Sequence, residues 1–315
     1  MADSLRVAIL AGLSEPVGPE SRSLEAVLAF EIASAFKQTA REIGGISVDL
    51  VARRGSWRGL PLLSLDPDEV PSADSRASQE ALYTQFILAD MLRDYDVIHC
   101  LAPLVATIQI LLSRGSAVLQ TWTVPKSDPA AELIPALARH ARWRCSALKP
   151  QHGYDGPVVI APCIDLSRFT VLEIHEPKYV LWLGDGGREL RVARAIARRL
   201  TLPLLTKIEC AERDLQGAAV FLDLPANPGP IPPLWALRAL ACGVPVGGWQ
   251  QSGLSEVIDS PEAGAVVPAG EWRQLADRLR DIAAPSPLRR QIVLRRYSRR
   301  AMVARYMAEY RSLLV

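Results

Sequence analysis

Short apolar runs alternate with longer amphipathic stretches through the first half of the chain. Residues 6–12 (RVAILAG) form an unbroken apolar run, which is typical of a strand buried on both faces of a sheet. In residues 23–43 the apolar positions recur at helical spacing, which predicts a helix. The alternation continues, with strands expected at 46–52, 95–101, 117–123 and 156–161 and helices at 79–93, 104–114 and 130–148. Strands that alternate with helices indicate a parallel sheet covered on both faces.

A second series of the same kind begins after Pro177. The pattern predicts strands at 179–184, 202–208, 218–224 and 244–248, and helices at 189–200, before Ala241-Cys242-Gly243, from near Glu256, and at 271–282. Residues 288–314 favour either one long basic helix or a bent pair of helices. The chain therefore reads as two consecutive α/β units, with a boundary between residues 165 and 178. Residues 54–78, rich in Pro, Ser, Asp and Gly, are expected to form a surface excursion.

Composition narrows the class of protein. The chain has 315 residues, of which 49% are hydrophobic, enough for one large domain or two of ordinary size. A formal net charge of +2 gives no global case for nucleic acid. Five cysteines without a C-x-x-C pair argue against a disulfide framework or a zinc site and fit a reducing cytosol.

The longest apolar run, around residues 97–112, is too short and too polar to span a bilayer. We expect a cytoplasmic protein with at most peripheral membrane contact. The Arg-rich residues 289–305 fit either a solvated helix face or a surface that touches anionic lipid or nucleic acid.

Five segments carry a resemblance to a known family, and they occur in the same order over nearly the whole chain. They are residues 95–100 (YDVIHC), 161–169 (APCIDLSRF), 179–184 (YVLWLG), 218–268 and 296–310. In these segments the chain resembles the retaining, family-4-like glycosyltransferases with the GT-B fold, which use nucleotide sugars.

The resemblance implies an α/β GT-B architecture of two Rossmann-like domains that face a central cleft. It assigns residues 1–168 to an acceptor-side domain and residues 169–297 to a donor-side domain. It assigns residues 298–315 to a C-terminal helix that packs back on the first domain.

The departures from the family pattern lie where its chemistry is expected. Loop 14–20 holds one glycine where the family has a Gly-Gly turn, and Leu101 stands in place of a second histidine. Asp185 stands where the family places an arginine that clamps the diphosphate. The family's two glutamates, spaced E-x7-E, would fall at Pro230 and Arg238, neither of which carries a carboxylate.

The candidate site residues lie at the carboxyl ends of strands or in the loops and helices that follow them. They are His99 for catalysis and Gly184, Arg188, Arg238, Ser252, Gly253 and Leu254 for the donor and its phosphates. Each has a structural alternative, such as a packed histidine, a solvated helix face or an ordinary strand-to-helix turn. No metal and no cofactor is expected, since the nucleotide sugar is a donor substrate.

Two functions follow from these observations. The first is transfer of a sugar from a nucleotide-sugar donor to an acceptor. The second is a catalytically inactive GT-B protein that acts as a binding partner, scaffold or regulator. A third possibility is altered donor chemistry, with Arg238 meeting a more anionic ligand.

Overall fold

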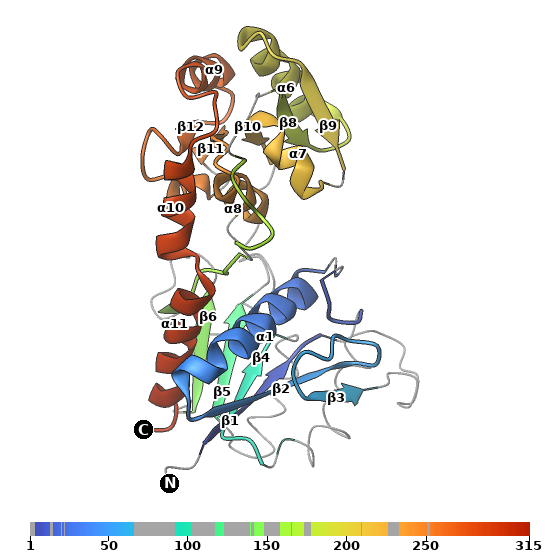
Figure 1. The fold of residues 1–315 in the computed structure, drawn as a ribbon, viewed down its shortest axis with the longest axis vertical. Helices are drawn as coiled ribbons and strands as arrows, with labels where there is room; N and C mark the ends of the chain where they lie inside the picture. The colour runs from blue at the N-terminus through green and yellow to red at the C-terminus, as the bar shows by residue number, and fades with distance from the viewer. Residues whose placement is uncertain are drawn as a thin grey trace. The chain divides into compact units, whose positions relative to one another are not determined.

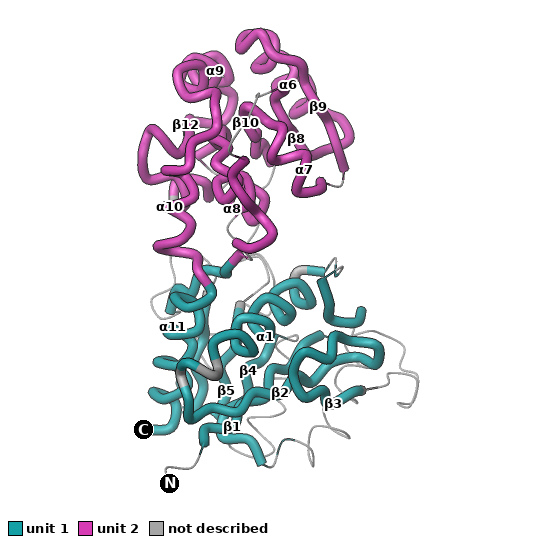
Figure 2. The backbone as a smooth tube through the Cα atoms, in the orientation of Figure 1, with its two compact units in different colours: residues 1–163, 299–315 teal, residues 164–298 magenta. Residues whose placement is uncertain are grey.

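The chain divides into two compact units, described here each by itself. A computed structural model describes residues 4–12, 15–19, 21, 23–65, 92, 94–101, 117–122, 139, 142–147, 158–164, 166–172, 178–208, 210–225, 233–250 and 253–315. One unit comprises Met1–Cys163 together with Arg299–Val315, and the other comprises Ile164–Ser298 (Figure 2). The predicted helix 104–114 lies outside the described residues, as does nearly all of the predicted helix 79–93.

The first unit is built on a seven-stranded sheet whose paired strands all run parallel. Its strands are β1 (Leu5–Leu10), β2 (Ile46–Arg53), β3 (Leu62–Leu65), β4 (Val97–Cys100), β5 (Ala117–Trp122), β6 (Trp143–Ala147) and β7 (Val158–Val159). They lie in the order β3-β2-β1-β4-β5-β6-β7, so the order reverses direction between β1 and β4. The predicted strands around 6–12, 46–52, 95–101, 117–123 and 156–161 are all present.

Two strands correct the prediction. The expected helix 130–148 cannot extend to its end, because residues 143–147 form β6 in the sheet. Trp143 and Cys145 are buried there while Arg144 is exposed, which is the period-two alternation of a strand. Residues 62–65, within the expected surface excursion, form the edge strand β3.

Two helices of the first unit pack against each other. They are α1 (Leu24–Ile43) and α11 (Arg299–Ser312), which come from opposite ends of the chain (Figure 1). The rings of Phe36 on α1 and Tyr310 on α11 stack with their centroids 5.9 Å apart. The basic C-terminal segment is thus a pair of helices, α10 (Pro287–Arg296) and α11, which confirms one of the two alternatives.

The second unit is built on a five-stranded parallel sheet. Its strands are β8 (Tyr179–Leu183), β9 (Leu204–Lys207), β10 (Ala218–Asp223), β11 (Val246–Trp249) and β12 (Gly264–Val267), in the order β12-β11-β10-β8-β9. Its helices are α6 (Gly187–Arg199), α7 (Glu212–Gln216), α8 (Leu234–Ala241), α9 (Trp272–Arg280) and α10. The helix expected from near Glu256 is a single 3₁₀ turn, Leu254–Glu256.

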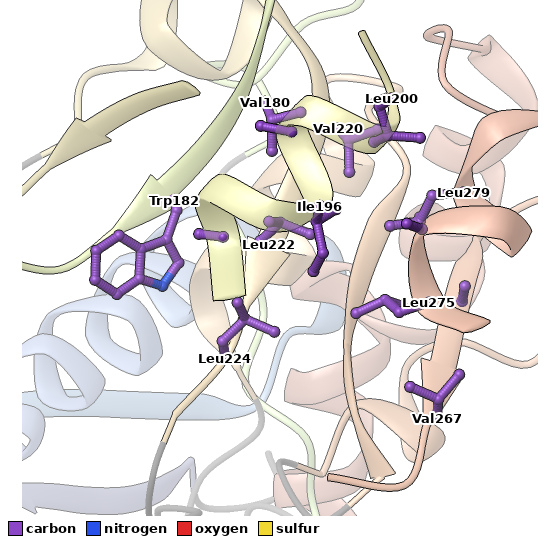
Figure 3. Close-up of a cluster of buried hydrophobic side chains, with 14 of the residues drawn as sticks. Val180, Trp182, Ile196, Leu200, Val220, Leu222, Leu224, Val267, Leu275 and Leu279 are labelled. Carbon is purple, nitrogen blue, oxygen red and sulfur yellow. The ribbon is translucent and has the colours of Figure 1, made fainter. Parts of the chain in front are cut away.

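One face of the second sheet carries an apolar core. Leu222 on β10, Ile196 on α6 and Leu279 on α9 belong to this core and are almost completely buried (Figure 3). The alternation of a strand therefore directs Val220, Leu222 and Leu224 to the side that α6 and α9 cover. The other side of β10 is left to Phe221 and Asp223.

Two arginines of the basic segment donate hydrogen bonds to backbone carbonyl groups of the second unit. Arg289 is 4% exposed, and its guanidinium donates hydrogen bonds to the carbonyl oxygens of Glu262, Gly243, Ala284 and Ile282. Arg290 donates to the carbonyl oxygens of Phe169, Ala241 and Leu166. These two side chains tie α10 to loops of the second unit, which a sequence pattern of charge alone does not reveal.

Candidate functional site

The strand order of the second sheet marks one place for a ligand. β8 is the first strand of this unit along the chain, and in the sheet it lies between β9 and β10. The chain adds β9 on one side of β8 and then β10, β11 and β12 on the other side. The winding direction therefore reverses between β8 and β10. In open parallel sheets, ligands bind outside the carboxyl ends of the strands at such a switch point. Here β8 ends at Leu183, before Gly184, and β10 ends at Asp223.

The turn after β8 is glycine-rich and leads directly into α6. A Cβ on Gly184 would lie 2.4 Å from the Trp182 ring, so this position admits no side chain while the ring stays in place. Gly186 is the N-cap of α6, and Arg188 is exposed in the first turn of that helix. Asp185 is also exposed. The structure thus puts Gly184 and Arg188 together at the switch point.

The segment after β11 approaches the end of β10 from the other side. Gly253 has a φ of 83°, a left-handed conformation that favours glycine, and it begins the 3₁₀ turn of Leu254. A Cβ on Gly248 would lie 2.2 Å from the carbonyl oxygen of Asp223 and 2.4 Å from Leu254 Cδ1. Gly253 and Leu254 therefore belong to the same sheet edge as β10, whereas Ser252 lies outside the described residues.

Asp223 is a further candidate at this edge, which sequence reasoning did not name as a site residue. Its Oδ2 atom is buried and has no hydrogen-bond partner among the described residues. Burial raises the pKa of this carboxyl to about 6. The sequence signal for this residue was one acidic position, 223, within the otherwise apolar run 218–224.

Arg238 has contacts that differ from those of a phosphate clamp. Its guanidinium carbon lies 4.5 Å from the centroid of the Trp235 ring and 5.4 Å from that of Phe169. These are cation–π distances, and they hold the guanidinium against two aromatic rings. Pro230 lies outside the described residues.

A second cation at this end of the sheet has a clear partner. Lys207, at the end of β9, has its Nζ 2.6 Å from Oδ1 of Asp214. The same carboxylate accepts a hydrogen bond from the amide of Ala211, and these contacts lower the pKa of Asp214 against the opposing effect of burial. Lys207 thus anchors α7 to the sheet, a pairing that sequence reasoning did not find.

His99 lies in the first unit, at the corresponding switch point of that sheet. It is 0% exposed, and its ring nitrogens lie 2.7 Å from Tyr310 Oη and 2.7 Å from Thr121 Oγ1. Burial lowers the pKa of the imidazole to about 3. These contacts account for a neutral, packed histidine without any ligand, and a catalytic role for His99 stays a prediction.

Comparison with solved structures identifies the architecture. The structure aligns over 98% of the chain with 99% of the sucrose-phosphate synthase of Thermosynechococcus elongatus, with a TM-score of 0.69 and 14% sequence identity. It aligns over 98% with AviGT4, a glycosyltransferase involved in avilamycin A biosynthesis, at TM-score 0.64 and 16% identity, with 98% of that chain covered. It also aligns over 97% with all of the Anabaena protein HepE in complex with UDP-glucose, at TM-score 0.63 and 12% identity. The chain has the GT-B fold.

Sequence comparison adds nothing to this result. No protein-family model matches the chain, and no curated protein matches its sequence. At 12–16% identity the solved GT-B structures establish the fold alone. The roles of individual residues therefore have to be argued from the geometry of this chain.

Two further observations concern metals and membranes. Within the described residues, no group of three or more His, Cys, Asp or Glu side chains is arranged to hold a metal ion. Among the helices that the structure describes, none has both the length and the apolar character that a membrane crossing requires.

Proposed function

We propose that this GT-B protein transfers a glycosyl group from a nucleotide-sugar donor to an acceptor. The observation that carries the proposal is the GT-B fold over 98% of the chain, with a glycine-rich turn and Arg188 at the switch point of the second sheet. A fold hosts a function only through its site, so the proposal rests on this edge of the sheet.

The nucleotide sugar is favoured by the solved GT-B structures. HepE is described in complex with UDP and with UDP-glucose, and AviGT4 is described as a glycosyltransferase. The alternative of a non-catalytic partner, scaffold or regulator gains no support from these comparisons. The donor's base and sugar and the acceptor are left open.

The residues at the sheet edge take the following roles. Gly184 leaves room for the Trp182 ring, which fills the space that a side chain would take. The donor meets the turn that follows, between Gly184 and α6. Arg188 and the backbone of Gly253 and Leu254 face the diphosphate and stabilise its departing charge. Arg238 holds the two aromatic rings beside it and supports this arrangement from α8.

The finer assignments follow the sequence resemblance. The reaction is of the family-4-like, retaining type, so the new bond at the anomeric carbon forms on the face that the diphosphate leaves. No metal takes part. The protein works in the cytoplasm, where its five free thiols stay reduced.

The test is a donor-hydrolysis assay with UDP-, GDP- and ADP-glucose. Arg188→Ala is expected to lower the rate at least tenfold, since removal of one charge-stabilising donor typically costs that much or more, about 10²-fold. Arg194→Ala is the matched control, because Arg194 is an equally exposed arginine further along α6. If wild type and Arg188→Ala hydrolyse the donor at equal rates, Arg188 does not belong to the site. If the wild type neither hydrolyses nor transfers the sugar of any donor, the proposed enzymatic function is wrong.

A further inference from the structure

Asp223 occupies the central position at the ligand-binding edge of the second sheet. It is the last residue of β10, which lies between β8 and β11. Its register partner on β11 is Gly248, and Leu222 before it pairs with Trp182 on β8. The switch point of the sheet is formed by the ends of β8 and β10, so Asp223 stands at the place where topology favours a ligand.

The side chain of Asp223 points away from the apolar core. Leu222 and Leu279 meet on the core side, where a Cβ on Gly247 would lie 2.5 Å from Leu279 Cδ1. Successive residues of a strand alternate between the two faces, so Asp223 and its partner Gly248 face the opposite side. On that side the nearest atom of a side chain to a Gly248 Cβ is Leu254 Cδ1.

The described residues that flank Asp223 across the sheet carry no side-chain donor. Leu183 on β8 and Leu254 are apolar, and Gly248 has no side chain. The Oδ2 atom is buried and makes no hydrogen bond within the described part of the chain. Arg238 lies against the rings of Trp235 and Phe169.

A buried acceptor without a partner costs stability, and an apolar residue would fit the run 218–224 better. A ligand that donates hydrogen bonds would supply the missing partner. An ionised carboxylate is an acceptor only, so it repels a diphosphate and binds a group with O–H or N–H. Hydroxyls occur on both sugar rings of every nucleotide sugar, and a vicinal pair can meet both carboxylate oxygens.

We propose that Asp223 is a ligand-binding residue that accepts hydrogen bonds from the hydroxyl groups of the donor, on its ribose or on its transferred sugar. This inference rests on the proposed function, since it names the group of the donor that this sheet edge recognises. Asp223 thereby orients the donor, while Arg188 and the backbone amides meet its phosphates.

The experiment is isothermal titration of wild type and Asp223→Asn with UDP, GDP and ADP, with their 2′-deoxy and 2′,3′-dideoxy counterparts, and with the corresponding nucleotide glucoses. Asp281→Asn is the matched control, because it makes the same chemical change at an exposed carboxylate after α9. Asp223→Asn keeps the shape of the side chain, and a thermal melt verifies that the variant is folded.

The expected result is at least a tenfold loss of affinity in Asp223→Asn and no change in Asp281→Asn. A loss that disappears with the 2′-deoxy or 2′,3′-dideoxy nucleotides assigns a ribose hydroxyl, and a loss confined to the nucleotide glucoses assigns the hexose hydroxyls. Both results support the proposal. A merely structural role would weaken every ligand equally.

Three results would overturn the proposal that Asp223 binds hydroxyl groups of the donor. If Asp223→Asn binds every nucleotide and every nucleotide glucose as tightly as the wild type does, Asp223 is not a ligand-binding residue, although the proposed function stands. If the loss is equal for the ribose, 2′-deoxyribose and 2′,3′-dideoxyribose nucleotides and independent of the glucose, the contact is not with a hydroxyl. If the wild type binds none of these compounds, the proposed function fails and this inference fails with it.

Discussion

Nδ1 of His99 lies 2.7 Å from the hydroxyl of Tyr310, a residue 211 positions later in the chain. The Nε2 atom of the same ring lies 2.7 Å from Thr121 Oγ1, which in turn lies 2.9 Å from Ser146 Oγ. The C-terminal helix α11 is therefore joined by a buried polar network to β4, β5 and β6 in the centre of the first sheet. Such networks stabilise a fold only when every member has its partner.

Removal of the Tyr310 hydroxyl is expected to destabilise the protein. Tyr310→Phe leaves a buried imidazole nitrogen without its partner, which costs about 1–3 kcal/mol of unfolding free energy. Urea unfolding followed by tryptophan fluorescence measures the loss. Tyr179→Phe is the control, because the Tyr179 hydroxyl donates to the Asp214 carbonyl at a half-buried site and its removal should cost less. Equal stabilities of Tyr310→Phe and wild type would show that the network does not hold α11.

The stability of the second unit is expected to fall as the pH rises through the range from 4 to 6. The pKa of Asp223 is raised from 3.8 to about 6 by burial, so between these values the folded chain binds a proton that the unfolded chain has released. The free energy of unfolding therefore decreases as the pH rises from 4 to 6. Above pH 6 the folded protein bears the full free-energy cost of the buried charge. Asp223→Asn removes this cost.

The variant Asp223→Asn is accordingly expected to be more stable than the wild type at pH 7.5, by about 2–3 kcal/mol for a shift of about two pKa units. The two proteins should converge in stability near pH 4. Chemical denaturation at both pH values, with Asp281→Asn as control, measures the difference. A wild type that is more stable than Asp223→Asn at pH 7.5 would show that the carboxylate has a partner in the free protein.

Glycine is expected to be required at 248 and dispensable at 186. A methyl group on Gly248 meets the carbonyl oxygen of Asp223 at 2.2 Å, whereas nothing lies within 4 Å of a Cβ on Gly186, whose φ of 168° is extended. Gly248→Ala forces β10 and β11 apart and should cost about 1–3 kcal/mol, while Gly186→Ala should change stability little. Thermal melts of both variants measure the two changes in stability. Similar melting temperatures for the two variants would contradict the close approach of the strands.

The architecture could be predicted from sequence because the strands of a parallel sheet are short apolar runs. Those around residues 6–12, 179–184 and 218–224 follow this rule and lie in the two sheets. β6 was missed because it occupies only residues 143–147, at the end of a segment with helical periodicity. β3 was missed because an edge strand in a polar segment has no buried faces to mark it.

The site could be predicted only in part. The sequence predicts that Gly184, Arg188 and Gly253 lie in turns after parallel strands, because such turns have recognisable residues, and the structure has them there. Their role in binding stays a prediction. The partners of Lys207, Arg238 and Arg289 depend on side chains and carbonyl groups that the fold brings together, and no local pattern indicates them. The same holds for the buried Oδ2 atom of Asp223, which has no hydrogen-bond partner among the described residues.

Direct titration with nucleotide sugars tests the central claim that this GT-B protein is a glycosyltransferase. Wild-type protein would be titrated calorimetrically with UDP-, GDP- and ADP-glucose, with glucose alone as the control ligand. The account predicts saturable binding of at least one nucleotide sugar, with one molecule per chain, and none of free glucose at the same concentration. The absence of binding by every nucleotide sugar at millimolar concentration would contradict it.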